Sequence, residues 1–155
     1  MKDLIKNHIA EHQAVLGELS NLIPQIEGVA STLVNALKNG QTIFWCGNGG
    51  SASDSQHLAG ELIGRYKGDR KPLKSIALNA DSAVMTCIVN DYGYEYIYSR
   101  QVEGLGVEGD VLVGITTSGN SENVLNALIT ANEMGLKTIG FLGKGGGKAT
   151  SLAQQ

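Results

Sequence analysis

The sequence has no long apolar run, few aromatic residues and no concentration of positive charge. No stretch approaches the ~18 consecutive apolar residues of a membrane-spanning helix. The first residues, Met1–His8, lack the apolar segment of a signal peptide. The 12 Lys and Arg residues are outnumbered by 15 Asp and Glu, and no basic face suits nucleic acid. We therefore expect a soluble globular protein that binds neither a membrane nor nucleic acid.

Cysteine is also scarce, whereas glycine is abundant. Cys46 and Cys87 form no paired-cysteine motif, so reduced thiols in a cytoplasm are expected. Glycine accounts for 21 of the 155 residues, about twice the usual ~7%. Because no collagen-like period is present, the excess belongs to loops and close backbone contacts. The length suits one domain with a sizeable core.

Apolar runs alternate with segments of helical periodicity after residue 40. Strands are predicted over 42–46, 74–79, 111–115 and 137–142, and helices over 52–66, 81–89, 94–104 and 124–134. This alternation predicts an α/β fold with a parallel sheet and right-handed crossovers. Ligands of such sheets bind beyond the carboxyl ends of the strands. The loops Gly47–Ser51 and Thr116–Ser121 should therefore converge there.

The first 40 residues form a helical segment of their own. Apolar residues from Ile5 to Leu37 alternate spacings of four and three, a 3.5-residue repeat typical of helices that pack side by side. Pro24 should divide the segment into two helices. This apolar stripe could pack on the chain's own core or against another subunit. Residues 1–40 are thus predicted as an oligomerisation and packing element, and residues 41–155 as the ligand-binding domain.

The glycine-rich loop after the first strand has the pattern of an anion site. Gly47–Gly50 allow a close backbone approach, and Ser51 is a candidate N-cap of the next helix. Free N–H groups and the positive helix end would then face one point. The loop also fits the G-x-G-x-x-A pattern of dinucleotide-binding folds. No acidic residue ends the second strand, however, so nicotinamide binding is not favoured.

A second loop brings several hydroxyl groups together. Thr116, Thr117 and Ser118 follow the third strand directly, and Ser121 precedes the next helix. Hydroxyls and N–H groups at a helix N-terminus suit a phosphate monoester. Ordinary turn and capping chemistry is the alternative.

Two further pairs of residues are candidates for catalysis or ligand binding. His57 and Glu61 stand at i and i+4, on one face of the helix that opens at the glycine loop. They could supply a general base or two metal ligands, or form an exposed helical pair. Asn90 and Asp91 lie where the helical periodicity breaks, and polar side chains at such places often contact ligands. Asp91 could equally cap a helix.

Three motifs together resemble a known family. They are Cys46-Gly-Asn-Gly-Gly-Ser-Ala-Ser-Asp-Ser-Gln-His57-Leu-Ala-Gly-Glu61, Asn90-Asp-Tyr-Gly93 and Thr117-Ser-Gly-Asn-Ser121. In this combination the sequence resembles the phosphoheptose isomerases, enzymes with a sugar-isomerase (SIS) domain, over essentially its whole length. The resemblance implies a flavodoxin-like three-layer sandwich, a homotetramer, a cytoplasmic location and a role in making heptose for bacterial surface polysaccharide such as lipopolysaccharide core or capsule.

The resemblance also assigns site residues. It implies that the enzyme converts sedoheptulose 7-phosphate to D-glycero-D-manno-heptose 7-phosphate. Glu61 matches the base, and His57 and Glu61 match two ligands of one zinc ion per subunit. The matching substrate contacts are Asn48, Gly49, Gly50, Ser51, Glu61, Asn90, Asp91, Thr116, Thr117, Ser118 and Ser121.

Two alternatives stay open at this point. One is a non-enzymatic SIS-domain tetramer that binds the bacterial replication initiator, although that relative lacks a glutamate at the position of Glu61. The other is a sugar-phosphate-sensing domain. The family continues beyond the position of Gln155 with a strand and a helix that carry further zinc ligands. We therefore expect an incomplete zinc site in these 155 residues.

Overall fold

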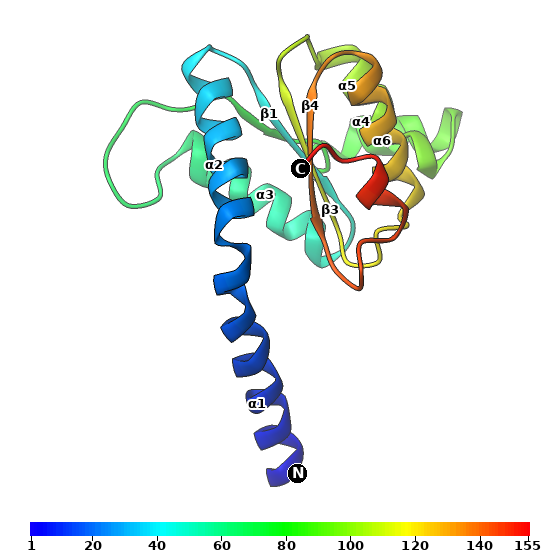
Figure 1. Cartoon of the computed structure of the whole chain (residues 1–155). Coiled ribbons are helices and arrows are strands. Elements are labelled where there is room, and N and C mark those ends of the chain that lie inside the picture. The colour runs from blue at the N-terminus through cyan, green and yellow to red at the C-terminus, as the bar shows by residue number, and fades with distance from the viewer.

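The computed structural model describes all 155 residues as an α/β body with a projecting N-terminal helix (Figure 1). The elements are α1 (Lys2–Glu18), η1 (Leu19–Leu22), α2 (Ile23–Lys38), β1 (Ile43–Gly47), α3 (Gly50–Ile63), β2 (Ser75–Ala77), α4 (Ser82–Asp91), η2 (Tyr94–Tyr96), α5 (Ser99–Leu105), β3 (Val111–Thr116), α6 (Glu122–Glu133), β4 (Lys137–Leu142) and η3 (Gly147–Ser151). All four predicted strands are present.

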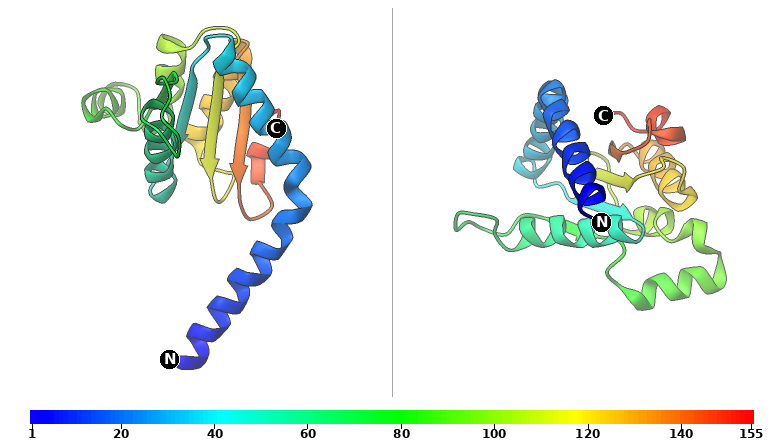
Figure 2. Two further views of the ribbon diagram at one scale, coloured as in Figure 1. Left: turned by 90° about the vertical axis from the view of Figure 1, so that its left-hand side faces the viewer. Right: turned by 90° about the horizontal axis from the view of Figure 1, so that it is seen from below.

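The four strands form one parallel sheet in the order β2-β1-β3-β4. In this flavodoxin-like order the chain reverses direction across the sheet between β1 and β3, and ligands bind at such a switch point. Helices α2 and α3 cover one face, and α5 and α6 lie on the other (Figures 1 and 2). The predicted three-layer sandwich is confirmed.

Both faces of the sheet are buried, because neighbouring residues of each strand enter different cores. Ile43 and Trp45 of β1 belong to the cluster under α2 and α3. Phe44 and Cys46 belong to the cluster under α5 and α6. Burial raises the pKa of the Cys46 thiol to about 12, so it stays neutral and packs as a small apolar group. This explains why the strands are continuous apolar runs.

The N-terminal helices leave most of their apolar stripe in solvent. Pro24 stands in the first turn of α2, as expected, and the short η1 joins α1 to α2. Only the later part of the stripe, around Leu33 and Leu37, packs on the sheet. Helix α1 has no buried residue and extends away from the body (Figure 2). The chain's own core therefore does not cover the first half of the stripe.

Three local predictions were wrong. The helix predicted over 94–104 is divided into η2 and α5, with a turn at Ile97 and Tyr98 between them. Helix α3 begins at Gly50 with Gly49 as its N-cap, so Ser51 is a first-turn residue and not the cap. Gly49 has φ 58°, a conformation that lets the chain enter the helix earlier. Likewise, Asn90 and Asp91 form the end of α4 and do not lie in a helix break. The break comes at Gly93, with φ 109°.

The last residues run beside β4. Gly140 donates its N–H to the carbonyl of Gln155, and Gln154 donates to the carbonyl of Thr138. Before them, Gly147–Ser151 form the short 3-10 helix η3. No helix of this fold combines the length and apolarity that crossing a membrane requires.

Candidate functional site

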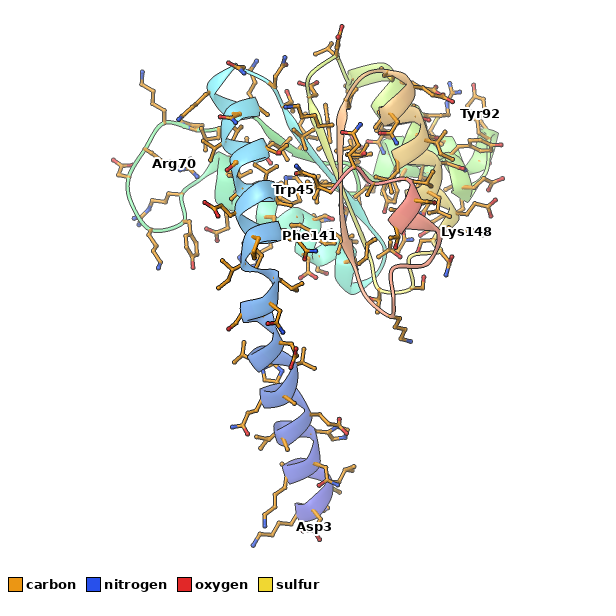
Figure 3. The ribbon with its side chains drawn as sticks, viewed as in Figure 1. Asp3, Trp45, Arg70, Tyr92, Phe141 and Lys148 are labelled. Carbon is orange, nitrogen blue, oxygen red and sulfur yellow. The ribbon has the colours of Figure 1, made fainter.

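Two adjoining grooves lie on the α2 and α3 side of the sheet. The first, of about 960 Å³, has an apolar floor with Trp45 and Phe141, which lie together beside α2 (Figure 3). The second groove is lined by Ser51 in the first turn of α3, by Thr117 after β3 and by glycines of the loop after β4. Gly49, Gly50, Ser118 and Ser121 lie outside the lining of both grooves. Asp54, Ile115 and Phe141 line both grooves, so the two grooves adjoin. Of the two loops predicted to converge, Ser51 and Thr117 lie at the same groove.

The glycine loop presents backbone donors at the start of α3. The carbonyl of Asn48 accepts from Ser51 N–H, and that of Gly49 accepts from Ala52 and Ser53. The N–H groups of Gly49 and Gly50 have no protein acceptor. Both residues are exposed, so these N–H groups are available to an anion at the helix N-terminus.

The Asn48 side chain, in contrast, is engaged inside the protein. Its Oδ1 accepts from Asn123 Nδ2 at 2.9 Å and from the Tyr94 hydroxyl at 2.9 Å. Its Nδ2 donates to Asn123 Oδ1 at 2.9 Å. The Tyr98 hydroxyl lies 3.2 Å from Asn48 Oδ1 and also contacts the Gly47 carbonyl. Sequence reasoning missed Asn123 and both tyrosines, because they come from separate segments and carry no local signal: Asn123 lies in α6, Tyr94 in η2 and Tyr98 in the turn before α5.

The hydroxyl loop combines buried and exposed groups. Thr116 is buried, and its Oγ1 lies 3.0 Å from Ser121 Oγ. Ser121 is the N-cap residue of α6, as predicted, but its side chain makes no capping hydrogen bond. Thr117 and Ser118 are exposed. A phosphate could thus meet Thr117 and Ser118 directly and compete for Ser121.

A second glycine-rich loop, Gly143–Gly147, and the start of η3 pack against the hydroxyl loop. The Ala149 N–H donates to the Gly119 carbonyl, and Asn120 Oδ1 accepts from Lys148 N–H. A Cβ placed on Gly119 would lie 1.8 Å from the Gly146 carbonyl oxygen, and Gly119 has φ 65°. The two loops can approach this closely only with glycine there.

We therefore expect Gly119→Ala to lower the free energy of unfolding by about 2 kcal/mol or more, through steric overlap and backbone strain. Gly145→Ala is the matched control. It also has positive φ, at 78°, but its Cβ would meet nothing within 4 Å. Urea unfolding of both variants measures the difference. Equal losses would show that the close approach of the loops contributes nothing.

His57 and Glu61 lie on α3 along the wall of the first groove. His57 Nε2 is 3.2 Å from Glu61 Oε1. The His57 side chain is 74% exposed and that of Glu61 33%. The second carboxylate oxygen of Glu61 has no protein partner. The predicted pair therefore exists, faces a cavity and keeps an oxygen free for proton transfer.

His57 and Glu61 can offer two zinc ligands, and no third candidate ligand lies beside them. No group of three His, Cys, Asp or Glu side chains lies close enough to hold a metal. An imidazole nitrogen and a carboxylate oxygen on adjacent turns are suitable zinc donors. The donor set fits half of a zinc site.

Asn90 and Asp91 lie apart from the two grooves. Asn90 Nδ2 donates to Asp91 Oδ1 at 2.7 Å, and both side chains are exposed at the end of α4. The next residue, Tyr92, lies at the edge of the molecule opposite Arg70 (Figure 3). Neither Asn90 nor Asp91 lines a groove. Their substrate contact stays a prediction.

Arg70 is a further residue at the groove that the sequence did not indicate. Its guanidinium donates to the carbonyls of Glu61 at 2.6 Å and Leu62 at 2.8 Å. These carbonyls belong to the last turn of α3, where helical partners are lacking. Arg70 thus fastens loop 64–74 to the helix end that carries Glu61.

Fold and site together define a doubly wound α/β protein with a glycine loop and a hydroxyl loop at the edge between β1 and β3. The model of the SIS domain family matches residues 7–143. Phosphoheptose isomerases of Campylobacter concisus and Geotalea uraniireducens are 50% and 51% identical, over 95% of this chain and 78% of each relative. The structure of phosphoheptose isomerase GmhA from Neisseria gonorrhoeae superposes with a TM-score of 0.91 at 38% identity, over 99% of this chain and 81% of that one.

A phosphoheptose isomerase from Francisella tularensis gives a TM-score of 0.93 at 36% identity, with the same coverage. The chain therefore belongs to the SIS domain family, among the phosphoheptose isomerases.

Proposed function

We propose that this protein isomerises sedoheptulose 7-phosphate to D-glycero-D-manno-heptose 7-phosphate. One observation carries the proposal: the His57–Glu61 pair lies in a groove that adjoins the groove lined by Ser51 and Thr117 of the two loops. An isomerase needs a proton-transfer group beside a phosphate site, and this arrangement offers both. The identity of about half of the residues to curated phosphoheptose isomerases supports the same reaction.

The two loops would hold the phosphate end of the substrate. Thr117, Ser118 and Ser121 supply hydroxyl donors, and Gly49 and Gly50 supply backbone N–H groups. Asn48 and Ser51 complete the glycine loop, and Thr116 orients Ser121 through their hydroxyl contact. Because no Lys or Arg side chain is among these groups, recognition relies on hydrogen bonds and the helix ends.

Glu61 would move the proton. Aldose–ketose isomerisation transfers a proton between C1 and C2 through an enediolate. The free carboxylate oxygen of Glu61 can take the proton from one carbon and return it to the other. His57, which contacts Oε1, holds the carboxylate in place.

His57 and Glu61 would also hold a zinc ion, which when bound supplies a Lewis acid near the developing negative charge. The Arg70 contacts keep the helix end that carries these side chains in a fixed position. No observation favours the initiator-binding or the sensing alternative, and the presence of Glu61 in the groove argues for an enzyme.

The direct test is incubation with sedoheptulose 7-phosphate, with and without added zinc. Formation of the heptose 7-phosphate, followed by proton NMR, is expected. Binding of the sugar phosphate without conversion would instead favour a sensing domain. Absence of both would contradict the proposal.

We also propose a cytoplasmic homotetramer in which the exposed stripe of α1 and α2 is buried between subunits. We further propose that the product supplies heptose for surface polysaccharide.

The exposed apolar stripe is the main support for the tetramer. Its residues Ile5, Ile9, Leu16, Leu19, Ile23 and Ile26 are all more than 40% exposed in the single chain. An apolar surface of this extent is typical of an interface.

Leu16→Glu combined with Leu19→Glu is accordingly expected to shift the assembly to smaller species in light scattering, because buried charges oppose association. The matched control replaces Gln13 and Ser20 by Glu, polar residues of the same segment. A wild-type protein that is folded and monomeric at micromolar concentration would contradict the proposal.

A further inference from the structure

We propose that Asn123 is a positioning residue for the glycine loop, and that Asn48 serves this loop as a structural partner of Asn123, with its Oδ1 not available as an acceptor for a substrate hydroxyl. The inference rests on the proposed function for its kinetic readout. We call Asn48, Tyr94, Tyr98 and Asn123 the amide clasp. It joins the loop after β1 to the first turn of α6.

The centre of the amide clasp is a reciprocal pair of carboxamides. Each of Asn48 and Asn123 donates one N–H to the other's Oδ1, and both distances are 2.9 Å. Asn123 is 2% exposed, and its Oδ1 also accepts the N–H of Val124. Burial makes an unsatisfied partner costly, so the pair should hold the two loops in one register.

The hydrogen-bond capacity of Asn48 Oδ1 is fully used. A carbonyl oxygen has two lone pairs, and Asn123 and Tyr94 supply two donors at 2.9 Å. The Tyr98 hydroxyl has one hydrogen, and its shorter contact is to the Gly47 carbonyl. Nothing remains at Oδ1 for a substrate hydroxyl.

Tyr98 keeps its proton under all ordinary conditions. Burial, together with the nearby Cys46 and Tyr94, raises the pKa of the Tyr98 phenol above its usual range. The hydroxyl therefore remains a donor to the base of the loop. The N–H groups of Gly49 and Gly50, which have no protein acceptor, remain free for ligand contact.

A double-mutant cycle separates positioning from direct contact. Asn123→Ala should raise KM for sedoheptulose 7-phosphate about 10-fold and change kcat less than about threefold, since the loop holds substrate and transition state alike. Asn48→Ala should have a similar effect. The double variant should be no worse than either single one, because each removes the same pair.

The matched control is Asn132→Ala on the same helix. Its half-buried amide donates to the Leu152 carbonyl at 2.8 Å, remote from the glycine loop. KM of this variant should stay within about twofold of wild type. Two results would overturn the proposal: effects of Asn48→Ala and Asn123→Ala that multiply in the double variant, or an Asn123→Ala variant that behaves like the control.

If Asn123→Ala does not fold, Tyr94→Phe provides the same test from an exposed position. It should raise KM about threefold in the wild type and not at all in the Asn48→Ala background. An equal effect in both backgrounds would overturn the proposal.

A measurement without substrate tests the amide clasp independently of the proposed function. Amide hydrogen exchange of residues 47–52 should be faster in Asn123→Ala and unchanged in Asn132→Ala. If Asn123→Ala exchanges faster but the wild-type protein has no isomerase activity, the proposed function is contradicted and the clasp is still supported. Identical exchange in both variants would overturn the clasp.

Discussion

Glu61→Gln is expected to reduce turnover of sedoheptulose 7-phosphate by about 10²-fold or more with little loss of stability. The amide keeps the size of the side chain and can still contact His57, but it cannot accept a proton. Glu61 is only partly buried and lies at the groove wall, so the fold does not depend on its charge.

The measurement is kcat by a coupled or NMR assay, alongside a urea unfolding curve. Glu103→Gln on α5 is the matched control, since this glutamate is exposed and lines neither groove. Near-normal turnover of Glu61→Gln would show that another group moves the proton. A loss of turnover accompanied by unfolding would leave the chemistry to be judged from Glu61→Asp, which retains a carboxylate but moves it.

Replacing Ser118 and Ser121 together by Ala should weaken binding of sugar phosphates strongly. Each hydrogen bond to the charged phosphate could contribute about 1.5–3 kcal/mol. The two losses together correspond to a 10²-fold or larger rise in Kd. Binding of the dephosphorylated sugar should hardly change, because both hydroxyls belong to the loop predicted to hold the phosphate.

The comparison of the two ligands by calorimetry decides the question. Ser31→Ala with Ser82→Ala is a suitable control, because both are exposed and lie outside the two grooves. Equal weakening for both ligands would indicate damage to the loop. Ser121→Ala also removes the hydroxyl contact with Thr116, so this substitution is the one more able to disturb the loop itself.

Local pattern was sufficient to predict the elements of the sheet. The apolar runs at β1 and β3 are long enough to fill a strand buried on both faces, and the turn residues around them set their ends. The convergence of the glycine and hydroxyl loops also followed, because parallel strands carry their next loops to one edge. The i, i+4 spacing of His57 and Glu61 was enough to predict their contact.

Capping and helix ends were less predictable. Ser51 has the residue type of an N-cap, but the positive φ of Gly49 starts α3 earlier. The end of α4 likewise depends on Gly93 and not on the polar Asn90 and Asp91. Backbone conformations open mainly to glycine outweighed side-chain preference at both places.

The amino-acid sequence by itself determined the α/β class, the amphipathic N-terminal stripe and the residues of the two loops. Only the tertiary structure decided that Asn123 meets Asn48, that Gly146 approaches Gly119, and that Arg70 fastens the end of α3. These contacts join residues 8 to 75 positions apart in the sequence. Periodicity and turn chemistry report only what neighbouring residues do, whereas such contacts depend on how helices and loops pack across the sheet.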